Sequence, residues 1–169
     1  MPKIYDYRTI VVGTDGSPLA GPTVAWAAWL AAHDDADLVI VCAYSELSRR
    51  DEARNVATLG GDTRIGLVTG RADASAAIAA AVRVAQEQSA TISAALLVDG
   101  EPASAILATA ADRAADLIVV GALRDTGIAD RLLGTVATEV VRRACCDVLV
   151  VRPRPDAGRQ PAAEEPATG

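Results

Sequence analysis

Short runs of β-branched and other apolar residues alternate with alanine-rich helical stretches along this chain, and this alternation limits the possible folds more than any other feature. The five runs lie at Thr9 to Gly13, Leu38 to Tyr44, Thr91 to Val98, Leu117 to Gly121 and Val148 to Arg152, the third being the weakest. Each is almost continuously apolar, which is typical of strands buried on both faces. The order predicts an α/β fold with an open five-stranded parallel sheet and helices on both faces.

Four helices are predicted between these strands. They cover approximately Pro18 to His33, Ala72 to Ser89, Pro102 to Arg113 and Thr135 to Ala144. The first is expected to begin with Ser17 as its N-cap and Pro18 at its first position, where the missing N–H of proline costs nothing. Trp26 and Trp29 lie three residues apart on this helix. We expect these rings to pack against the sheet, the alternative being an exposed surface for a partner.

The last helix is expected to turn Val136, Val140 and Val141 inward. At 169 residues the chain is long enough for about one domain. We expect a folded domain over residues 1–152 and a disordered tail over residues 153–169, because the tail has four prolines and almost nothing to bury. The polar connection from Ser45 to Gly70 is expected to be a loop at the ligand edge of the sheet.

Net charge and hydropathy exclude two classes of partner. A formal charge of −6 and a pI near 4.7 leave no basic face for a nucleic acid. No apolar run reaches the length that spans a bilayer, and the first residues carry no apolar leader segment. We therefore expect a cytoplasmic protein that binds neither nucleic acid nor membrane.

Three cysteines, Cys42, Cys145 and Cys146, occur in the chain without any Cys/His spacing typical of a metal site. We expect all three to be reduced, partly buried packing residues. A redox switch or an intermolecular disulfide at Cys145 or Cys146 is the alternative.

Two strand ends carry residues suited to a nucleotide. After the fourth run, Gly121 opens a loop that ends in Gly134-Thr135 at the start of a helix. A helix N-terminus presents unpaired N–H groups to an anion, and a hydroxyl there can donate to a phosphate. After the first run, Asp15 either accepts hydrogen bonds from a ribose or an adenine, or caps the helix that follows. Tyr44, just beyond the second run, either stacks on a base or only borders this edge.

Three motifs together resemble the universal stress protein family. They are Val11 to Ser17 (VVGTDGS), Gly100 to Ile106 (GEPASAI) and the loop from Gly121 to Thr135. The resemblance extends from Arg8 to Arg152. It implies a Rossmann-like parallel α/β fold of the adenine nucleotide alpha hydrolase type, and a homodimer that often forms through the last strand, here Val148 to Arg152.

The resemblance also implies a nucleotide site. Nucleotide-binding members of the family carry Gly, two residues, Gly, nine residues, Gly and then Ser or Thr, and Gly121, Gly134 and Thr135 match this pattern. Asp15 matches the acidic residue on the adenosine side, and Ala43 and Val120 fall where the family contacts adenine. The residues implied to bind the nucleotide are Gly13, Thr14, Asp15, Ala43, Val120, Gly121, Arg124, Gly134, Thr135 and Val136.

The chain departs from the family pattern at Arg124, which replaces the second glycine. If the backbone there requires a positive φ, an arginine raises the conformational energy by about 1 kcal/mol or more, and its side chain obstructs the ribose or the phosphate. Alternatively, its guanidinium donates charge-assisted hydrogen bonds to the phosphate. Gly127 is a candidate to supply the backbone flexibility of the missing second glycine.

Catalytic residues are not predicted. The only histidine is His33 and the only lysine is Lys3, and no Gly-Lys-Ser/Thr phosphate loop is present, so rapid phosphoryl transfer would lack charge stabilisation. The predicted function is a homodimeric stress-response module that binds ATP, AMP or cyclic AMP, with Mg²⁺ accompanying ATP. The alternative is a dimeric interaction module of the same family that works without a nucleotide. Slow ATP hydrolysis is a third, weaker hypothesis.

Overall fold

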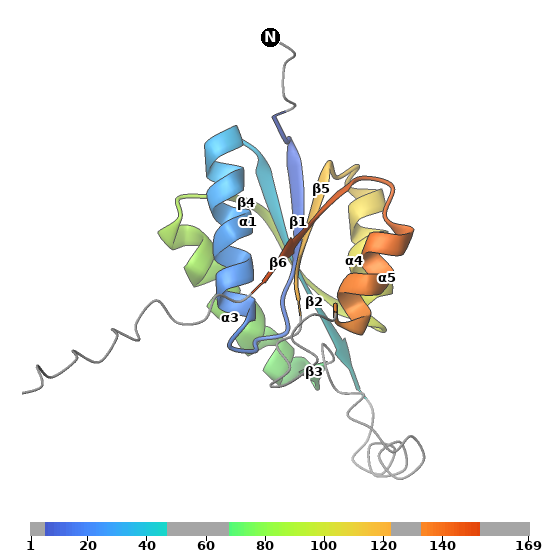
Figure 1. Ribbon diagram of the computed structural model, residues 1–169. Helices are drawn as coiled ribbons and strands as arrows, with labels where there is room; N and C mark the ends of the chain where they lie inside the picture. The colour runs from blue at the N-terminus through green and yellow to red at the C-terminus, as the bar shows by residue number, and fades with distance from the viewer. Residues whose placement is uncertain (1–5, 47–67, 123–132, 153–169) are drawn as a thin grey trace, which may run out of the picture.

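The computed structural model describes residues 6–46, 68–122 and 133–152 as a three-layer α/β structure, with a central sheet between two pairs of helices (Figure 1). Residues 1–5, 47–67, 123–132 and 153–169 lie outside this description. The elements are β1 (Thr9–Gly13), α1 (Ala20–Asp34), β2 (Asp37–Ser45), β3 (Val68–Thr69), α3 (Arg71–Glu87), β4 (Thr91–Asp99), α4 (Pro102–Asp112), β5 (Leu117–Gly121), α5 (Thr135–Arg143) and β6 (Asp147–Val151).

The five long strands run parallel in the order β4-β2-β1-β5-β6, so the predicted sheet is confirmed. The sheet also contains β3, a two-residue strand that the sequence did not predict. It pairs in parallel with Tyr44 and Ser45 at the end of β2. Because β4 pairs with the other side of β2 at Tyr44, β3 lies on the same side of β2 as β1, beyond the end of β1.

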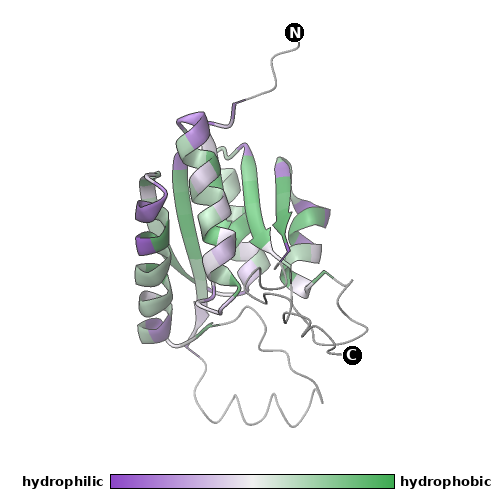
Figure 2. Cartoon of the chain, turned by 60° about the vertical axis from the view of Figure 1, so that its left-hand side comes forward, coloured by the Kyte–Doolittle hydropathy of each residue, from purple (hydrophilic) through white to green (hydrophobic). Residues whose placement is uncertain are grey.

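Both faces of the three central strands, β1, β2 and β5, are buried, whereas the edge strands β4 and β6 are mostly half-buried. In Figure 2 the strands are coloured as strongly hydrophobic and lie behind helices of mixed polarity. On one face, Ile10, Val12, Leu38 and Val119 pack against α1 and α3, and on the other, residues such as Val11 and Ile118 pack against α4 and α5. Burial of each large aliphatic side chain contributes about 1.5–3 kcal/mol of transfer free energy. Two-sided burial therefore explains the apolar runs of β1, β2 and β5, but the expectation was wrong for β4 and β6, which lie at the edges of the sheet.

The first helix begins later than predicted. α1 starts at Ala20 with Leu19 as its N-cap, and no side chain caps it, so the expectation for Ser17 and Pro18 was wrong. The reason is a preceding turn: the Asp15 carboxylate accepts a hydrogen bond from the Ser17 N–H at 2.9 Å, and Gly16 has a φ of 73°. The backbone carbonyl of Ser17 then accepts from the Ala20 N–H.

Both tryptophans lie on the surface, so their predicted burial was wrong. Trp26 is 41% exposed and Trp29 is 49% exposed. The sheet-facing side of α1 consists of small residues and one valine, and this brings the helix axis too close to the sheet for an indole ring. These residues are Ala20, Thr23, Val24, Ala27, Ala28 and Ala31. Val141 of α5 is also 49% exposed, contrary to expectation, because Ala137 and Val140 fill the inward side of that helix.

In the part of the chain that the structure describes, no helix combines the length and the apolar character needed to cross a membrane.

The tight turn after β1 yields a stability prediction. A Cβ on Gly16 would lie 2.9 Å from the Cβ of Ala77 on α3, in a backbone conformation with positive φ. We expect Gly16→Ala to lower the free energy of unfolding by about 2 kcal/mol through backbone strain and steric overlap. Gly21→Ala is the matched control, because its Cβ would meet nothing within 4 Å. It should raise the free energy of unfolding by about 0.5 kcal/mol, since α1 loses a glycine. Urea unfolding of both variants measures the difference, and equal changes would contradict this account of the turn.

Candidate nucleotide pocket

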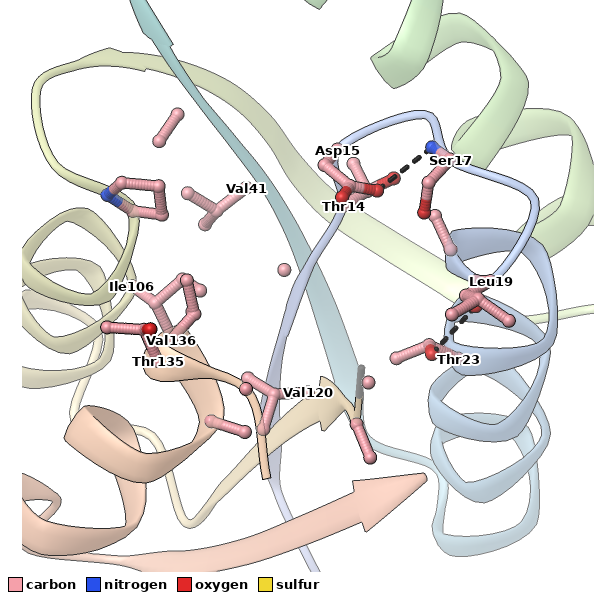
Figure 3. A pocket seen from close by; sticks show the side chains of 18 residues that line it. Thr14, Asp15, Ser17, Leu19, Thr23, Val41, Ile106, Val120, Thr135 and Val136 are labelled. Carbon is pink, nitrogen blue, oxygen red and sulfur yellow. Dashed lines mark hydrogen bonds between the residues drawn. The ribbon is translucent and has the colours of Figure 1, made fainter. Parts of the chain in front are cut away.

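A pocket lies at the carboxyl ends of β1, β2 and β5, where the N-termini of three helices meet it (Figure 3). Its volume is about 100 Å³. A single ordered water needs only about 10–15 Å³ of such space, so the pocket can admit an organic group. The position agrees with the general rule that ligands of parallel sheets bind beyond the carboxyl ends of the strands.

The structure brings nine of the ten predicted site residues together in the lining of this pocket. They are Gly13, Thr14, Asp15, Ala43, Val120, Gly121, Gly134, Thr135 and Val136. The tenth, Arg124, and the neighbouring Gly127 lie outside the described residues. Figure 3 places Thr14 and Asp15 on one side of the pocket and Thr135 and Val136 on another, with Val41 and Val120 between them.

The β1 side of the pocket is fixed by its own hydrogen bonds. The Thr14 N–H donates to the carbonyl of Val41 at 2.9 Å, which extends the pairing of β1 with β2 by one residue. Asp15 Oδ1 accepts from the Ser17 N–H, and the described residues offer no donor to Oδ2. Because Leu19 is the N-cap of α1, Asp15 does not cap that helix, and the capping interpretation was wrong. A carboxylate oxygen is thus available at the edge of the pocket.

The N-termini of α1, α4 and α5 border the pocket, and α1 has no side-chain cap. The N-termini of α4 and α5 differ in how their N–H groups are bonded. At α4, Glu101 accepts hydrogen bonds from the N–H groups of Ala103 (2.9 Å) and Ser104 (2.8 Å). Burial raises the pKa of Glu101, but these two hydrogen bonds and the nearby Arg143 outweigh that effect and hold the pKa below its usual value. The positive end of α4 is therefore already neutralised by a carboxylate of the chain itself.

At α5 the described residues place no such carboxylate. Gly134 is the N-cap, has no side chain, and leaves the first N–H groups of the helix without a side-chain acceptor. The hydroxyl of Thr135 and the backbone of Val136 and Ala137 line the pocket directly. An anion placed here would meet unpaired N–H groups, the positive end of the macrodipole and a hydroxyl donor.

Two of the predicted glycines lie where a Cβ would overlap a side chain of a neighbouring helix. A Cβ on Gly121 would lie 2.8 Å from Oγ1 of Thr23, and a Cβ on Gly13 would lie 2.6 Å from Cδ1 of Ile106. These glycines allow α1 and α4 to approach the strand ends closely. The structure therefore gives Gly121 a structural reason that is independent of phosphate binding.

The charge of the lining is nearly neutral. Asp15 is the only ionisable side chain among the described lining residues, and none of them is a lysine, arginine or histidine. His33 lies at the far end of α1, where its Nδ1 is 2.9 Å from Oδ1 of Asp34 and its ring stacks on Trp29. Tyr44 is only 8% exposed and packs beside Cys42, away from the lining. Within the described ranges, no group of three or more His, Cys, Asp or Glu side chains could hold a metal ion.

The sequence did not identify the lining residues that come from α1 and α4. Thr23 is 2% exposed, and its hydroxyl donates to the carbonyl of Leu19 at 3.0 Å while it borders the pocket. Ile106 of α4 closes the other side. Helical periodicity predicts that these side chains face inward, but it does not say that the inward space at this level is a pocket.

The three thiols are free, but their environments differ. Cys42 is fully buried, and burial together with the charge of Asp15 raises its pKa to about 11. Cys146 is half-buried. Its burial and, to a smaller extent, the negative charge of Asp147 raise its pKa. Cys145 is exposed, so the expectation that all three are packing residues was wrong at that position.

Comparison with known proteins identifies the family. The model of the universal stress protein family matches residues 6–152. The chain belongs to the universal stress protein family. Universal stress protein Rv1636 of Mycobacterium tuberculosis H37Rv is 38% identical over 145 residues, which cover 86% of this chain and 96% of the relative.

Solved structures agree with this assignment. A crystal structure of a universal stress protein in complex with cAMP has a TM-score of 0.65 and 32% identity, and the match covers 87% of this chain and 98% of that one. A universal stress protein from Archaeoglobus fulgidus in complex with dAMP has a TM-score of 0.59 and 24% identity, over 86% of this chain and 98% of that one. The fold is thus shared with relatives that bind adenine nucleotides.

Proposed function

We propose that this universal stress protein binds an adenine nucleotide in the pocket at the carboxyl edge of its sheet and acts as a ligand-responsive regulatory module in the stress response. The observation that carries the proposal is the arrangement of the Asp15 carboxylate and the N-terminus of α5 around an apolar floor. Asp15 offers an acceptor to a ribose hydroxyl or an adenine amino group, and Thr135 and Val136 offer donors to a phosphate. The relatives solved with cAMP and dAMP support the same ligand class.

The contrast between the two helix N-termini supports the position of the phosphate. Glu101 occupies the donors of α4, and a second anion there would meet its negative charge. At α5 the N-cap is Gly134, and no carboxylate of the described residues accepts from its N–H groups. We therefore assign the phosphate to Gly134, Thr135 and Val136, and the base to the space beside Ala43, Val41 and Val120, where the side chains are apolar.

Charge favours a nucleotide with a single phosphate group. The described lining carries no cationic side chain, so a helix N-terminus supplies its positive potential, equivalent to about half a unit charge. This is too little to balance the triphosphate of ATP. We infer that cyclic AMP or AMP binds more tightly than ATP, and that Mg²⁺ accompanies ATP only when ATP is bound.

The rival proposal is a dimeric module that works without a nucleotide. It is favoured by the packing roles of Gly13 and Gly121, because these glycines would be needed in either case. For slow ATP hydrolysis, Asp15 is the one candidate general base among the described lining residues. Measured nucleotide affinity separates the first two proposals.

The phosphate assignment predicts the effect of one substitution. We expect Thr135→Val to weaken binding of cyclic AMP and AMP by about tenfold, the loss of one hydrogen bond to a charged group, and to leave adenosine binding unchanged. Thr138→Val is the matched control, because Thr138 lies on the same helix outside the pocket lining. Calorimetric titration measures all three ligands. No heat with any nucleotide at millimolar concentration would reject nucleotide binding and leave the rival proposal.

Arg124 is proposed to supply a cation to the phosphate. Its guanidinium charge and its position between Gly121 and Gly134 support this role, because the described lining contains no cation. We expect Arg124→Gln to weaken AMP binding by roughly tenfold at low salt and to reduce the salt dependence of binding, with adenosine unaffected. Arg83→Gln, on the exposed side of α3, is the control. Tighter binding by Arg124→Gln would show instead that the arginine obstructs the site.

A homodimer is proposed to form through the open edge of β6. In the described structure β6 pairs only with β5, and an edge strand offers unpaired backbone groups to a second copy. The Asp147 N–H donates to the carbonyl of Asp116, and the Val151 carbonyl accepts from the Ala122 N–H. Backbone groups of successive residues in a strand point to opposite sides, so the Val150 N–H faces the open edge.

This alternation predicts that Val150→Pro removes one outward donor and produces a monomer, whereas Val150→Ala keeps the N–H and remains dimeric. Light scattering at micromolar concentration measures both masses against the 17.3 kDa chain. A monomeric wild-type protein would contradict the dimer.

A further inference from the structure

The outward side of α1 is an apolar surface with two half-exposed tryptophan rings. Trp26 and Trp29 contact each other edge to face with ring centroids 5.7 Å apart, and Trp29 stacks on His33 at 5.4 Å. Pro22 and Ala32 are exposed on the same helix. From Ala20 to Ala32 the helix has no charged residue. We call the residues Pro22, Trp26, Trp29, Ala32 and His33 the α1 surface.

No other described helix exposes an aromatic ring. α3 exposes Arg71, Asp73 and Arg83, and α5 exposes Arg142 and Arg143. α4 also has no charged residue from Pro102 to Ala111, but the side chains it exposes there are small. A helix that is apolar on all sides is normally covered on all sides. Exposed tryptophans packed together on such a helix are typical of a surface that another segment covers.

The chain leaves the described structure close to this helix. Val151, the last residue of β6, belongs to the same buried cluster as Val24, Ala27 and Ala28 of α1. The following 17 residues, 153–169, could extend about 50 Å as a polyproline II segment. The 15 residues of α1 span only about 22 Å. Residues 153–169 are therefore long enough to cover the whole length of α1.

The composition of residues 153–169 matches the α1 surface. The segment contains four prolines, Pro153, Pro155, Pro161 and Pro166, and proline-rich segments dock on aromatic surfaces because little conformational entropy is lost.

The size of the α1 surface favours a tethered segment over a second copy. A stable complex between separate molecules buries about 800 Å² on each partner, which is more than one half-exposed helix face supplies. A segment of the same chain is present at an effective concentration of about millimolar, so a small contact area is sufficient. We propose that residues 153–169 dock along the α1 surface, with their prolines on Trp26 and Trp29.

The two tryptophans of the α1 surface are the only tryptophans in the chain, so intrinsic fluorescence reports on this surface alone. The test variant replaces Pro153, Pro155, Pro161 and Pro166 by serine in the full-length protein. We expect acrylamide quenching of the indole emission to increase roughly twofold and the emission maximum to move to longer wavelength, because the rings lose their cover.

The matched control replaces four alanines of the same segment, Ala157, Ala162, Ala163 and Ala167, by serine and should leave both readouts unchanged. Equal quenching in the wild type and the proline variant would overturn the proposal. Quenching that falls as the protein concentration rises from about 1 to about 100 µM would also overturn it, because a second copy would then be the cover. Nucleotide affinity is measured in parallel and should not change, since the α1 surface is separate from the pocket.

Discussion

The parallel pairing of β1 with β2 on one side and β5 on the other is the constraint on which the rest of the structure depends. It buries the strands on both faces and brings their carboxyl ends to one edge. Residues that are far apart in the sequence, such as Asp15, Ala43 and Val120, meet at that edge for this reason alone. The helices that follow the strands then direct their N-termini toward the same space, and the cap of each helix decides which N-terminus remains available to an anion.

Alanine has a large part in this arrangement. The chain contains no phenylalanine, and the inward sides of α1 and α3 are built mainly from alanine. Small side chains let these helices lie close to the sheet, and the close approach of α1 favours glycine at Gly121, where a Cβ would meet Thr23. It also leaves no room for Trp26 and Trp29 beneath α1, so the two largest side chains of the chain lie on its surface. The shape of the pocket and the exposure of the α1 surface both follow from the small side chains on the inward sides of these helices.

The strands, their parallel arrangement and the pocket residues Gly121, Gly134 and Thr135 followed from the sequence because each depends on a local pattern: a continuous apolar run, a glycine at a strand end, or a hydroxyl at a helix start. Other pocket residues, such as Ala43 and Val120, followed from the resemblance to the family. The errors have a different origin. Whether Ser17 caps α1 depends on the turn at Gly16, which packs against Ala77 of a distant helix. Whether Trp26 is buried depends on the distance between α1 and the sheet. Tertiary contacts of this kind override local propensity, and a single sequence does not contain them in readable form.

The central claim is that an adenine nucleotide binds with its phosphate at the uncapped N-terminus of α5. A crystal structure of the chain with cyclic AMP tests it most directly. The account predicts phosphate oxygens about 3 Å from the backbone nitrogen of Val136 or the hydroxyl of Thr135, with the base beside Ala43 and Asp15. A phosphate bound at α4 or elsewhere on the molecule would contradict it, and so would a pocket that stays empty at saturating ligand.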